Sequence, residues 1–534
     1  MTTAGDAITT ATLVRPGTTA APARFALQLR PGQDPDRQAG RVRAALAPLD
    51  VAVGPLSALD PDVLVVELPD RSFGADPAAA FTAAHELRER FDAAAAEPDL
   101  PTAFFPEDAE RGDGEDPGQE SVEAFPPGCW APPDPALDTD PQWALRAIGV
   151  PQAWEFSAAR RRPVRGDGVV VAQPDTGVTA HPELTGVIRA GGWDVLDGDA
   201  DPTDPLGAGN PGHGTATASV LVSPGSLVVT GTAPQVRHLP IRAIESVVRV
   251  SQVSVARAID WAVDHGAEVI TMSLGGLPSF ALHRALRRAV AADVVVLAAA
   301  GNCVRTVVWP ARYDDCLAVA GTNVRSEPWR GSCRGGAVDV AAPAENVLRA
   351  RTGVPGAGQG QGTSFAVAMT AGVAALWLAH HGRSALVAAA HARGETLQVM
   401  FRRLLRATAR RPDGWDSAGM GAGIVDARAL LGADLDLGRG QEGLAPPTGE
   451  GSVESLVEEV FGTEAVDEQL DWQRFGPEIA TAVLQARLPA GGGPLPEGRP
   501  SAVVTERLAD AVENPVLRAR LGLPTAPQRA GAPR

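Results

Sequence analysis

The sequence contains no lysine, so all 47 of its basic residues are arginine, and they are outnumbered by 64 aspartate and glutamate residues. The formal net charge is −17. Binding to nucleic acid requires clustered positive charge that neutralises phosphates. The composition therefore argues against a nucleic-acid partner. We interpret the missing lysine as a bias of genomic composition and not as a mark of function.

Long hydrophobic runs are also missing. No stretch reaches the roughly 18 consecutive apolar residues of a membrane span. The N-terminal segment 1–17 has neither the basic region nor the apolar region of a secretory signal. We therefore expect a soluble protein without a membrane partner. Cytoplasmic residence is the default prediction, and export by an unconventional route stays open.

Cysteine is scarce, with four residues and no CxxC spacing that would indicate zinc, at Cys129, Cys303, Cys316 and Cys333. In a reducing cytoplasm we expect free thiols. Cys303 is interpreted as a small buried hydrophobic residue. A disulfide from Cys303 to Cys316 or Cys333 stays an alternative, because sequence does not give the geometry.

At 534 residues, 44% of them hydrophobic, the chain is long enough for several domains. Residues 1–22 are polar, lack periodicity and are expected to be disordered. Residues 23–106 have the pattern of a small α+β module, with strands predicted over 24–31, 63–69 and 99–105 and helices over 34–49 and 76–94. Residues 107–135, acidic and rich in glycine and proline, indicate an exposed linker.

Residues 136–432 alternate between short apolar runs and amphipathic stretches. Near-continuous apolar strands separated by helices predict an α/β domain, with a parallel sheet that carries helices on both faces. Functional sites on such sheets lie at the carboxyl ends of strands. Residues 433–534 contain further helical stretches, and their role is not evident from the sequence.

Three short motifs lie where strands end or helices begin. Asp175, in the run VVVAQPDTG, follows a hydrophobic strand, His213 stands between two glycines, and Ser364 opens a long apolar helix. Each motif alone is as easily a simple turn. In the order Asp, His, Ser within one domain they match the triad order of subtilisin. The set predicts a serine nucleophile, a histidine base and an aspartate that orients the base.

The domain also resembles the subtilase family over about residues 139–432, through GHGT, ITMSLGG, AAAGN, VAAP and GTSFAVAMTAGVAAL. The resemblance implies a subtilisin-like fold and a serine endopeptidase that acts on protein or peptide substrates. It implies that Asn302 donates a side-chain hydrogen bond to the oxyanion. It further implies that Ser273, Leu274 and Gly275 bind the substrate backbone by strand addition.

The order of strands and helices in the N-terminal module resembles a subtilase propeptide, which implies an intramolecular inhibitor and a zymogen. An alternative is a regulatory or peptide-binding protein in which the peptidase domain is accessory or silent. A silent domain would be expected to lack at least one of Asp175, His213, Ser364 and Asn302, and all four are present.

The chemistry predicted here needs no cofactor, but one loop suggests a structural metal. The segment GGWDVLDGDADPTD resembles a calcium loop of thermitase-like subtilases, and clustered carboxylates suit calcium. The candidate ligands are Asp194, Asp197 and Asp199, with Asp201 and Asp204 beside them. A solvated acidic loop is the alternative. Pro174, immediately before Asp175, is a less usual residue at this position of the family. A proline there removes a backbone N–H next to Asp175.

Overall fold

The computed structural model describes residues 13–14, 22–47, 49–73, 77–100, 102–103, 132, 134–207, 210–247, 249–352, 356–440, 452–487 and 504–524. The chain divides into two compact units. One contains Met1–Pro101, Leu277–Ala281 and Ser452–Arg534, and the other contains Thr102–Gly276 and Leu282–Gly451. Most of the linker expected over 107–135 lies outside the described residues.

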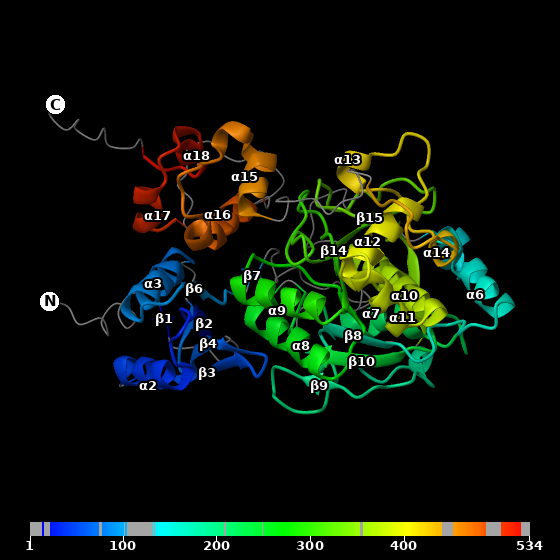
Figure 1. Cartoon of the computed structure of the whole chain (residues 1–534), viewed down its shortest axis with the longest axis horizontal. Helices are drawn as coiled ribbons and strands as arrows, with labels where there is room; N and C mark the ends of the chain where they lie inside the picture. Colours follow the sequence, from blue (N-terminus) through cyan, green and yellow to red (C-terminus); the bar gives the residue numbers. More distant parts are fainter. Residues whose placement is uncertain are drawn as a thin grey trace. The chain divides into compact units, whose positions relative to one another are not determined.

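The larger unit is built on a seven-stranded sheet in which every neighbouring pair is parallel (Figure 1). The strand order is β15-β14-β13-β12-β8-β10-β9. The chain enters at the interior strand β8 and adds β10 on one side and β12 on the other, so the direction of winding reverses at β8. The strands are β8 (Val170–Asp175), β9 (Trp193–Asp194), β10 (Arg237–Arg242), β12 (Val269–Met272), β13 (Val295–Ala299), β14 (Leu317–Thr322) and β15 (Val340–Pro343).

Both faces of this sheet are covered, as the apolar runs predict. Successive side chains of a strand point to opposite faces, and every residue of β8, β13 and β14 is buried. On one face Val171, Leu297 and Val319 share a core with α7 (His213–Val222) and α10 (Thr363–His381). Helix α8 (Gln252–Asp264) also packs on β8 and β10. The predicted α/β class with a parallel sheet is confirmed.

Shorter elements complete the larger unit. They are β7 (Thr102–Ala103), α4 (Pro135–Asp138), α5 (Trp143–Ala147), α6 (Val150–Ala159), η2 (Pro182–Leu184), β11 (Arg249–Val250), α9 (Phe280–Ala291, whose first two residues fall in the other unit), β16 (Val347–Ala350), β17 (Ala357–Gly360), α11 (Arg383–His391), α12 (Leu397–Thr408), α13 (Ser417–Met420) and α14 (Ala427–Leu431).

Helix α10 is long and apolar enough to cross a membrane by length and composition. However, 94% of its apolar window is buried inside the protein. Its residues Phe365, Val373 and Trp377 belong to the core described above. The helix is apolar on all sides because protein surrounds it.

The smaller unit contains a four-stranded antiparallel sheet with the order β3-β4-β2-β6. Its elements are β2 (Ala23–Gln28), α2 (Pro35–Leu46), β3 (Ala52–Ser57), β4 (Asp60–Leu68), β5 (Ser72–Phe73), α3 (Pro77–Arg90) and β6 (Ala95–Pro98). Strand β3 is absent from the prediction, because Gly54 and Pro55 weaken its strand pattern. Leu13–Val14 form strand β1 with β5, contrary to the disorder expected for residues 1–22.

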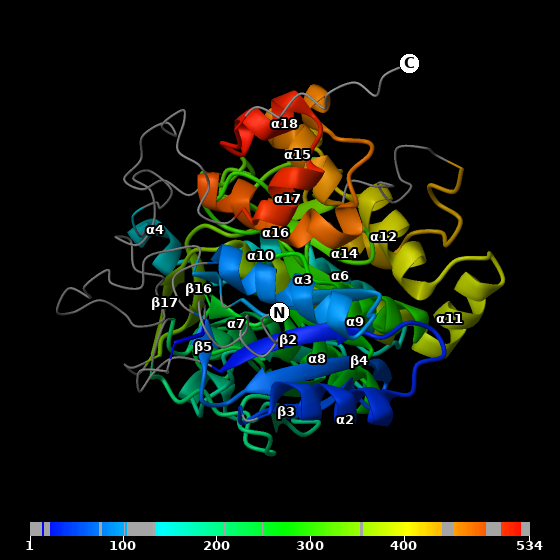
Figure 2. The ribbon, with the colours of Figure 1, turned by 90° about the vertical axis from the view of Figure 1, so that its left-hand side faces the viewer.

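The C-terminal residues of the smaller unit form helices, as their periodicity predicts. They are α15 (Val453–Phe461), η4 (Thr463–Ala465), α16 (Trp472–Arg487), α17 (Glu506–Ala511) and α18 (Pro515–Arg520). Helix α16 packs against β6, and it lies beside α3 in both views of the ribbon (Figures 1 and 2). The N-terminal module and the C-terminal extension are thus parts of one compact unit, although the whole of the larger unit separates them in the sequence.

Candidate active site

Asp175 is the last residue of β8, at the reversal of winding where ligands of open α/β sheets bind. The neighbouring Pro174 has no backbone N–H, but this removes no hydrogen bond between the strands of the sheet. Odd-numbered residues of β8 bond toward β10, as Val169 and Asp175 do when their carbonyls accept from Arg237 and Ala243. Pro174 therefore faces β12, and the pairing with β12 ends at Ala172. The N–H that proline lacks would lie beyond the last paired residues of β8 and β12.

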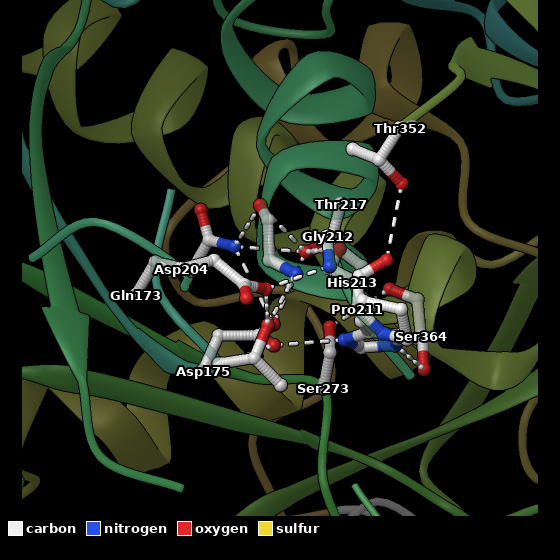
Figure 3. Close-up of polar contacts among 12 residues, drawn as sticks. Gln173, Asp175, Asp204, Pro211, Gly212, His213, Thr217, Ser273, Thr352 and Ser364 are labelled. Carbon is white, nitrogen blue, oxygen red and sulfur yellow. Dashed lines mark hydrogen bonds and ion pairs between the residues drawn. The ribbon is translucent and has the colours of Figure 1, made fainter. Parts of the chain in front are cut away.

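His213 and Ser364 each stand at the start of a helix, and both reach the Asp175 end of the sheet (Figure 3). His213 Nδ1 lies 2.8 Å from Asp175 Oδ1, and His213 Nε2 lies 3.1 Å from Ser364 Oγ. The side chain of Asp175 is 0% exposed. In this arrangement Nδ1–H donates to the aspartate and Nε2 accepts from the serine hydroxyl. The structure brings together the three residues that the motifs predicted.

The buried Asp204 joins the segments that carry Asp175 and His213. Its Oδ2 accepts from the Thr176 hydroxyl and from the Gly212 backbone N–H, each at 2.7 Å. Thr176 directly follows the aspartate and Gly212 directly precedes the histidine. In the sequence, Asp204 stood out only as part of an acidic loop, so this role was missed.

Glycines allow the backbone segments to approach each other at the site. A Cβ at Gly214 would lie 2.1 Å from the carbonyl oxygen of Gly177, and a Cβ at Gly177 would lie 2.6 Å from the Asp204 nitrogen. Both contacts are shorter than any carbon side chain tolerates, and Gly177 also has a φ of +105°. The glycines that flank the aspartate and histidine motifs are thus required by this geometry.

Asn302 lies beside the nucleophile. Its Oδ1 accepts from the backbone N–H of Thr363 at 3.0 Å and from the Thr363 hydroxyl at 2.9 Å. A Cβ built on Gly362 would lie 3.5 Å from Asn302 Nδ2 and 3.8 Å from Ser364 Cβ. The amide nitrogen therefore points into the same corner as the serine. The Ser364 backbone N–H lies in the first turn of α10, where the helix supplies no acceptor.

The residues expected to bind substrate follow the carboxyl end of β12. The Ser273 hydroxyl donates to the Ser364 carbonyl at 3.0 Å and so holds the nucleophile turn. Leu274 is 3% exposed, and a Cβ at Gly275 would lie 2.5 Å from Val308 Cγ2. These contacts connect the segment to the site, while its binding of a substrate backbone stays a prediction.

Sequence reasoning missed two residues that contact Asp175 from the side opposite His213. The Thr217 hydroxyl lies 3.1 Å from Asp175 Oδ2, and Gln173 Nε2 lies 2.8 Å from Thr217 Oγ1. Both residues are 1% exposed. The only sequence signal was a glutamine inside an otherwise apolar strand.

The acidic loop does not have the geometry of the predicted calcium site. Arg242 Nη1 donates to Asp194 Oδ2 at 2.5 Å and to Asp197 Oδ2 at 2.7 Å, so a guanidinium takes the place of a cation between them. Asp199 Oδ1 instead accepts from the Asp201 backbone N–H. Among the residues that the structure describes, no cluster of three His, Cys, Asp or Glu side chains is arranged to hold a metal. The three aspartates do not fit calcium.

We expect Arg242→Met to lower the free energy of unfolding by about 2–3 kcal/mol, because the Asp194 side chain is 3% exposed and would lose its ionic partner. Urea denaturation measures the change. Arg325→Met is the matched control, because the Arg325–Glu327 pair is exposed and such pairs contribute about 0–1 kcal/mol. Equal losses in the two variants, or a melting temperature that EDTA lowers in the wild type but not in Asp197→Asn, would contradict this account of the loop.

Three cysteines lie in the described part of the chain, and all are buried and outside disulfides: Cys303, Cys316 and Cys333. The alternative disulfides from Cys303 are therefore not formed. Burial raises the pKa of the Cys316 thiol far above its ordinary value. That thiol is kept protonated and unreactive. Cys129 lies outside the described residues.

The sequence comparisons agree with this geometry. A model of the subtilase family matches residues 166–423. Thermitase from Thermoactinomyces vulgaris is 37% identical over 261 residues, which is 48% of this chain and 88% of thermitase. Subtilisin BL from Lederbergia lenta is 34% identical over 237 residues, or 44% of this chain and 82% of the relative. A solved prenylagaramide maturation protease aligns with a TM-score of 0.42 and 27% identity, covering 53% of this chain and 97% of that protein.

A parallel sheet with a serine, a histidine and an aspartate at its carboxyl edge defines a hydrolase of the serine type. The chain belongs to the subtilase family. It is a subtilisin-like serine endopeptidase, as the motifs predicted.

Proposed function

We propose that Asp175, His213 and Ser364 form the catalytic triad and that the enzyme cleaves peptide bonds through an acyl-enzyme. The observation that carries this proposal is the unbroken series of hydrogen bonds from Ser364 Oγ through His213 to Asp175. It places a base within reach of a hydroxyl and an ionised partner behind the base. No cofactor enters the proposed steps.

In the first step, Ser364 Oγ attacks the carbonyl carbon of the scissile bond while His213 Nε2 takes the hydroxyl proton. The tetrahedral intermediate collapses, the C–N bond breaks, and His213 returns that proton to the leaving amine. Water then attacks the acyl carbon while His213 Nε2 takes a proton from it. The Ser364 ester bond breaks, His213 returns that proton to Ser364 Oγ, and the carboxylic acid product leaves. The Asp175 carboxylate holds the imidazole in the required tautomer and stabilises the imidazolium.

The oxyanion that forms twice in this sequence needs donors that are already in place. Asn302 Nδ2 and the Ser364 backbone N–H are the proposed pair. Asn302 is fixed by two hydrogen bonds to Thr363, so its amide can act without reorganising. This arrangement supports the role that the family resemblance implies.

We also propose that the N-terminal module is an intramolecular inhibitor, so that the chain is made as a zymogen. Thr102–Ala103, near the end of the predicted module and within the larger unit, form strand β7, which pairs antiparallel with Arg249–Val250. A peptide that adds a strand in this way is bound as an extended substrate would be. The pairing supports an inhibitory segment that binds the peptidase domain as an extended strand.

Autoprocessing tests both proposals. We expect the wild-type chain to cut itself within residues 104–131 during purification, and Ser364→Ala to remain full length. Ser226→Ala, an exposed serine-to-alanine change, is the control and should process normally. Intact-mass measurements read out the products. Uncut wild type that still hydrolyses a casein substrate would contradict the zymogen and leave the triad standing. Identical cleavage in Ser364→Ala would contradict the triad.

A buried carboxylate makes the module sensitive to pH. Glu97, on β6, accepts from the Ser279 hydroxyl at 2.5 Å and from the Phe280 backbone N–H at 3.0 Å, within the smaller unit. Burial raises the pKa of Glu97 to about 7, and these hydrogen bonds only partly oppose the rise. The folded state therefore favours the protonated carboxyl over the ionised one.

The raised pKa predicts that this contact is most stable below about pH 4.5 and weakens as the pH rises toward 7. The loss reaches at most about 3 kcal/mol above pH 7, from a shift of roughly two to three units. Hydrogen exchange of the peptides that cover 95–98 and 277–281 measures it between pH 5 and pH 8, after correction for the intrinsic exchange rate. Glu97→Gln should flatten the dependence. Greater protection at pH 8 than at pH 5 would contradict this account.

A further inference from the structure

The C-terminal extension carries a fully buried carboxylate, Glu478, in the middle of α16. Its Oε1 accepts from the Thr505 backbone N–H at 2.5 Å, and its Oε2 lies 3.2 Å from the Thr505 hydroxyl. A third contact, His85 Nε2 at 3.2 Å, comes from α3 of the N-terminal module. A buried carboxylate is tolerated when donors surround it. The module therefore supplies one of the donors that the extension needs.

Apolar and ionic contacts surround this buried pair. Phe475, 5% exposed, lies with its ring centroid 5.2 Å from that of His85. Near the solvent, Glu89 of the module forms two ion pairs. Its Oε1 lies 2.9 Å from Arg474 Nη2 and 2.6 Å from Arg507 Nη1. Those two arginines precede and follow residues 488–503, so two separate segments of the extension converge on the same helix of the module.

Helices α15 and α16 of the extension pack against each other, and Leu456, Ile479, Val483 and Leu508 of the extension are fully buried. A segment of about 70 residues buries little apolar surface and is only marginally stable by itself. The contacts with α3 and β6 supply a partner within the same unit. The extension and the module thus bury surface against each other within one compact unit.

We propose that the C-terminal extension is a clamp that retains the N-terminal module after the chain is cut between the module and the peptidase domain. A cut within 104–131 would then leave the module attached to the chain through α16 and α17, not free to diffuse. Release would require a second event that removes or unfolds the extension. The retention is a physical property of the smaller unit, whereas its effect on activity rests on the inhibitory role proposed above.

A capture experiment on the full chain tests retention without any catalysis. In a Ser364→Ala background, recognition sequences for a site-specific protease are inserted within 107–131 and within 441–451, and a tag follows Arg534. After both cuts, we expect the tag to recover the module in about equimolar amount with the extension. Recovery of the extension without the module would overturn the proposal.

Charge reversal shows whether the described contact is responsible for the retention. Glu89→Arg should reduce module recovery at least tenfold, and the triple variant Glu89→Arg, Arg474→Glu, Arg507→Glu should restore it. Asp36→Arg, on the exposed side of α2, is the control and should change nothing. The triple variant restores the ion pairs with reversed charges. If the module is again recovered with it, the loss in Glu89→Arg was caused by the broken contact and not by misfolding. Full recovery from Glu89→Arg, or none from the triple variant, would overturn the clamp.

The same cut in an active chain separates this inference from the proposed function. The active chain carries only the inserted protease site within 107–131, and it is cut there. A retained inhibitor then keeps the rate of peptide hydrolysis low, and Glu89→Arg should raise that rate. A rate that is unchanged while the capture result holds would refute the inhibitory role and leave the clamp intact.

A second inference concerns the face of Asp175 opposite His213, where a directional series of hydrogen bonds ends (Figure 3). His238 Nε2 lies 2.8 Å from Gln173 Oε1, and Gln173 Nε2 donates to Thr217 Oγ1 at 2.8 Å. Thr217 Oγ1 accepts that bond, and its single proton has three acceptors within reach: Asp175 Oδ2 at 3.1 Å and the backbone carbonyls of His213 at 3.1 Å and Gly214 at 3.2 Å. Of these the ionised carboxylate is the strongest acceptor. Gln173 Nε2 also donates to the Gly214 carbonyl at 2.9 Å, which uses its second proton.

His238 sets the direction of this series. It is 0% exposed, and its Nδ1 has no hydrogen-bond partner among the residues that the structure describes. Burial, together with the charge of Arg189, lowers the pKa of His238 well below its ordinary value, so the ring is neutral. Because Nε2 faces a carbonyl oxygen and Nδ1 faces no acceptor among the described residues, the one ring proton lies on Nε2 and is donated to Gln173 Oε1. This fixes the orientation of the Gln173 amide, so that its nitrogen faces Thr217 Oγ1.

We infer that Thr217 and Gln173 are positioning residues for the proposed triad, which this inference presupposes. Thr217 contacts Asp175 Oδ2, and Gln173 holds Thr217 in place. The carboxylate is thereby kept in the orientation in which Oδ1 accepts from His213 Nδ1. Thr217→Val removes the donor without changing side-chain shape, whereas Thr217→Ser keeps the hydroxyl. We expect the valine variant to lose about tenfold in kcat with KM unchanged, and the serine variant to retain most of the activity.

The control is Thr370→Val, which removes another buried helix hydroxyl, one that donates only to the Ala366 carbonyl of its own helix. The downfield proton resonance of His213 Nδ1–H gives a second readout, expected to shift in Thr217→Val and not in Thr370→Val. An unchanged kcat or an unshifted resonance in Thr217→Val would overturn this inference. Wild-type activity in Ser364→Ala would instead refute the triad itself.

Discussion

Ser364→Ala is expected to reduce kcat on the order of 10⁶-fold, the size of the loss when the nucleophile of a subtilisin is removed. The reason is geometric. His213 Nε2 lies 3.1 Å from the Ser364 hydroxyl, the nucleophile from which it would accept a proton. Without that oxygen there is no acyl-enzyme, and only oxyanion stabilisation and substrate binding remain. Initial rates on a chromogenic peptide, with purified chains at equal concentration, measure the change.

The control must show that the fold survives. Ser364 is 6% exposed at the start of α10, and alanine has the higher helix propensity. The melting temperature of Ser364→Ala should therefore be close to that of the wild type. Residual activity above a hundredth of the wild-type rate, in a preparation free of contaminating protease, would be incompatible with Ser364 as the nucleophile.

Asn302→Ala is expected to lower kcat by about 10²–10³-fold with little change in KM, the magnitude found when one oxyanion donor of a subtilisin is removed. The substrate carbonyl is neutral in the ground state and gains its charge in the transition state. A donor aimed at the oxyanion therefore acts mainly on kcat. Steady-state kinetics over a range of substrate concentrations separate the two constants.

Asn302 also holds the nucleophile turn, and this second role needs its own control. Thr363→Val removes the hydroxyl that donates to Asn302 Oδ1 and keeps the amide nitrogen of Asn302. Its kcat should fall far less than that of Asn302→Ala. Equal losses in the two variants would mean that Asn302 acts by positioning Thr363 and does not contact the oxyanion.

The sequence was sufficient to predict the sheet and the grouping of Asp175, His213 and Ser364, because both leave local signals. Apolar strands alternating with helices specify a parallel sheet, and glycines mark the close approach of the segments that carry Asp175 and His213. Those glycines are needed by local backbone geometry, so the motif and the site coincide. The same reasoning anticipated Ser364 at the start of a helix.

Contacts between distant residues left no such signal. The acidic loop resembled a calcium site, but Arg242, on a strand more than forty residues later, neutralises Asp194 and Asp197. Only the fold brings that arginine to the loop. Similarly, Glu478 and His85 lie 393 residues apart in the sequence and meet in one buried contact. The role of the C-terminal extension could not be inferred from its helical periodicity for this reason.

The most direct test of the central claim is covalent labelling by a fluorophosphonate, which reacts with an activated serine hydroxyl. The wild-type chain is treated until peptide hydrolysis stops and is then analysed by peptide mass spectrometry. We expect one adduct per chain, on Ser364, and no adduct in His213→Ala, because the hydroxyl is not activated without its base. Loss of activity with the adduct on another residue, or equal labelling of Ser364 in His213→Ala, would contradict the proposed triad.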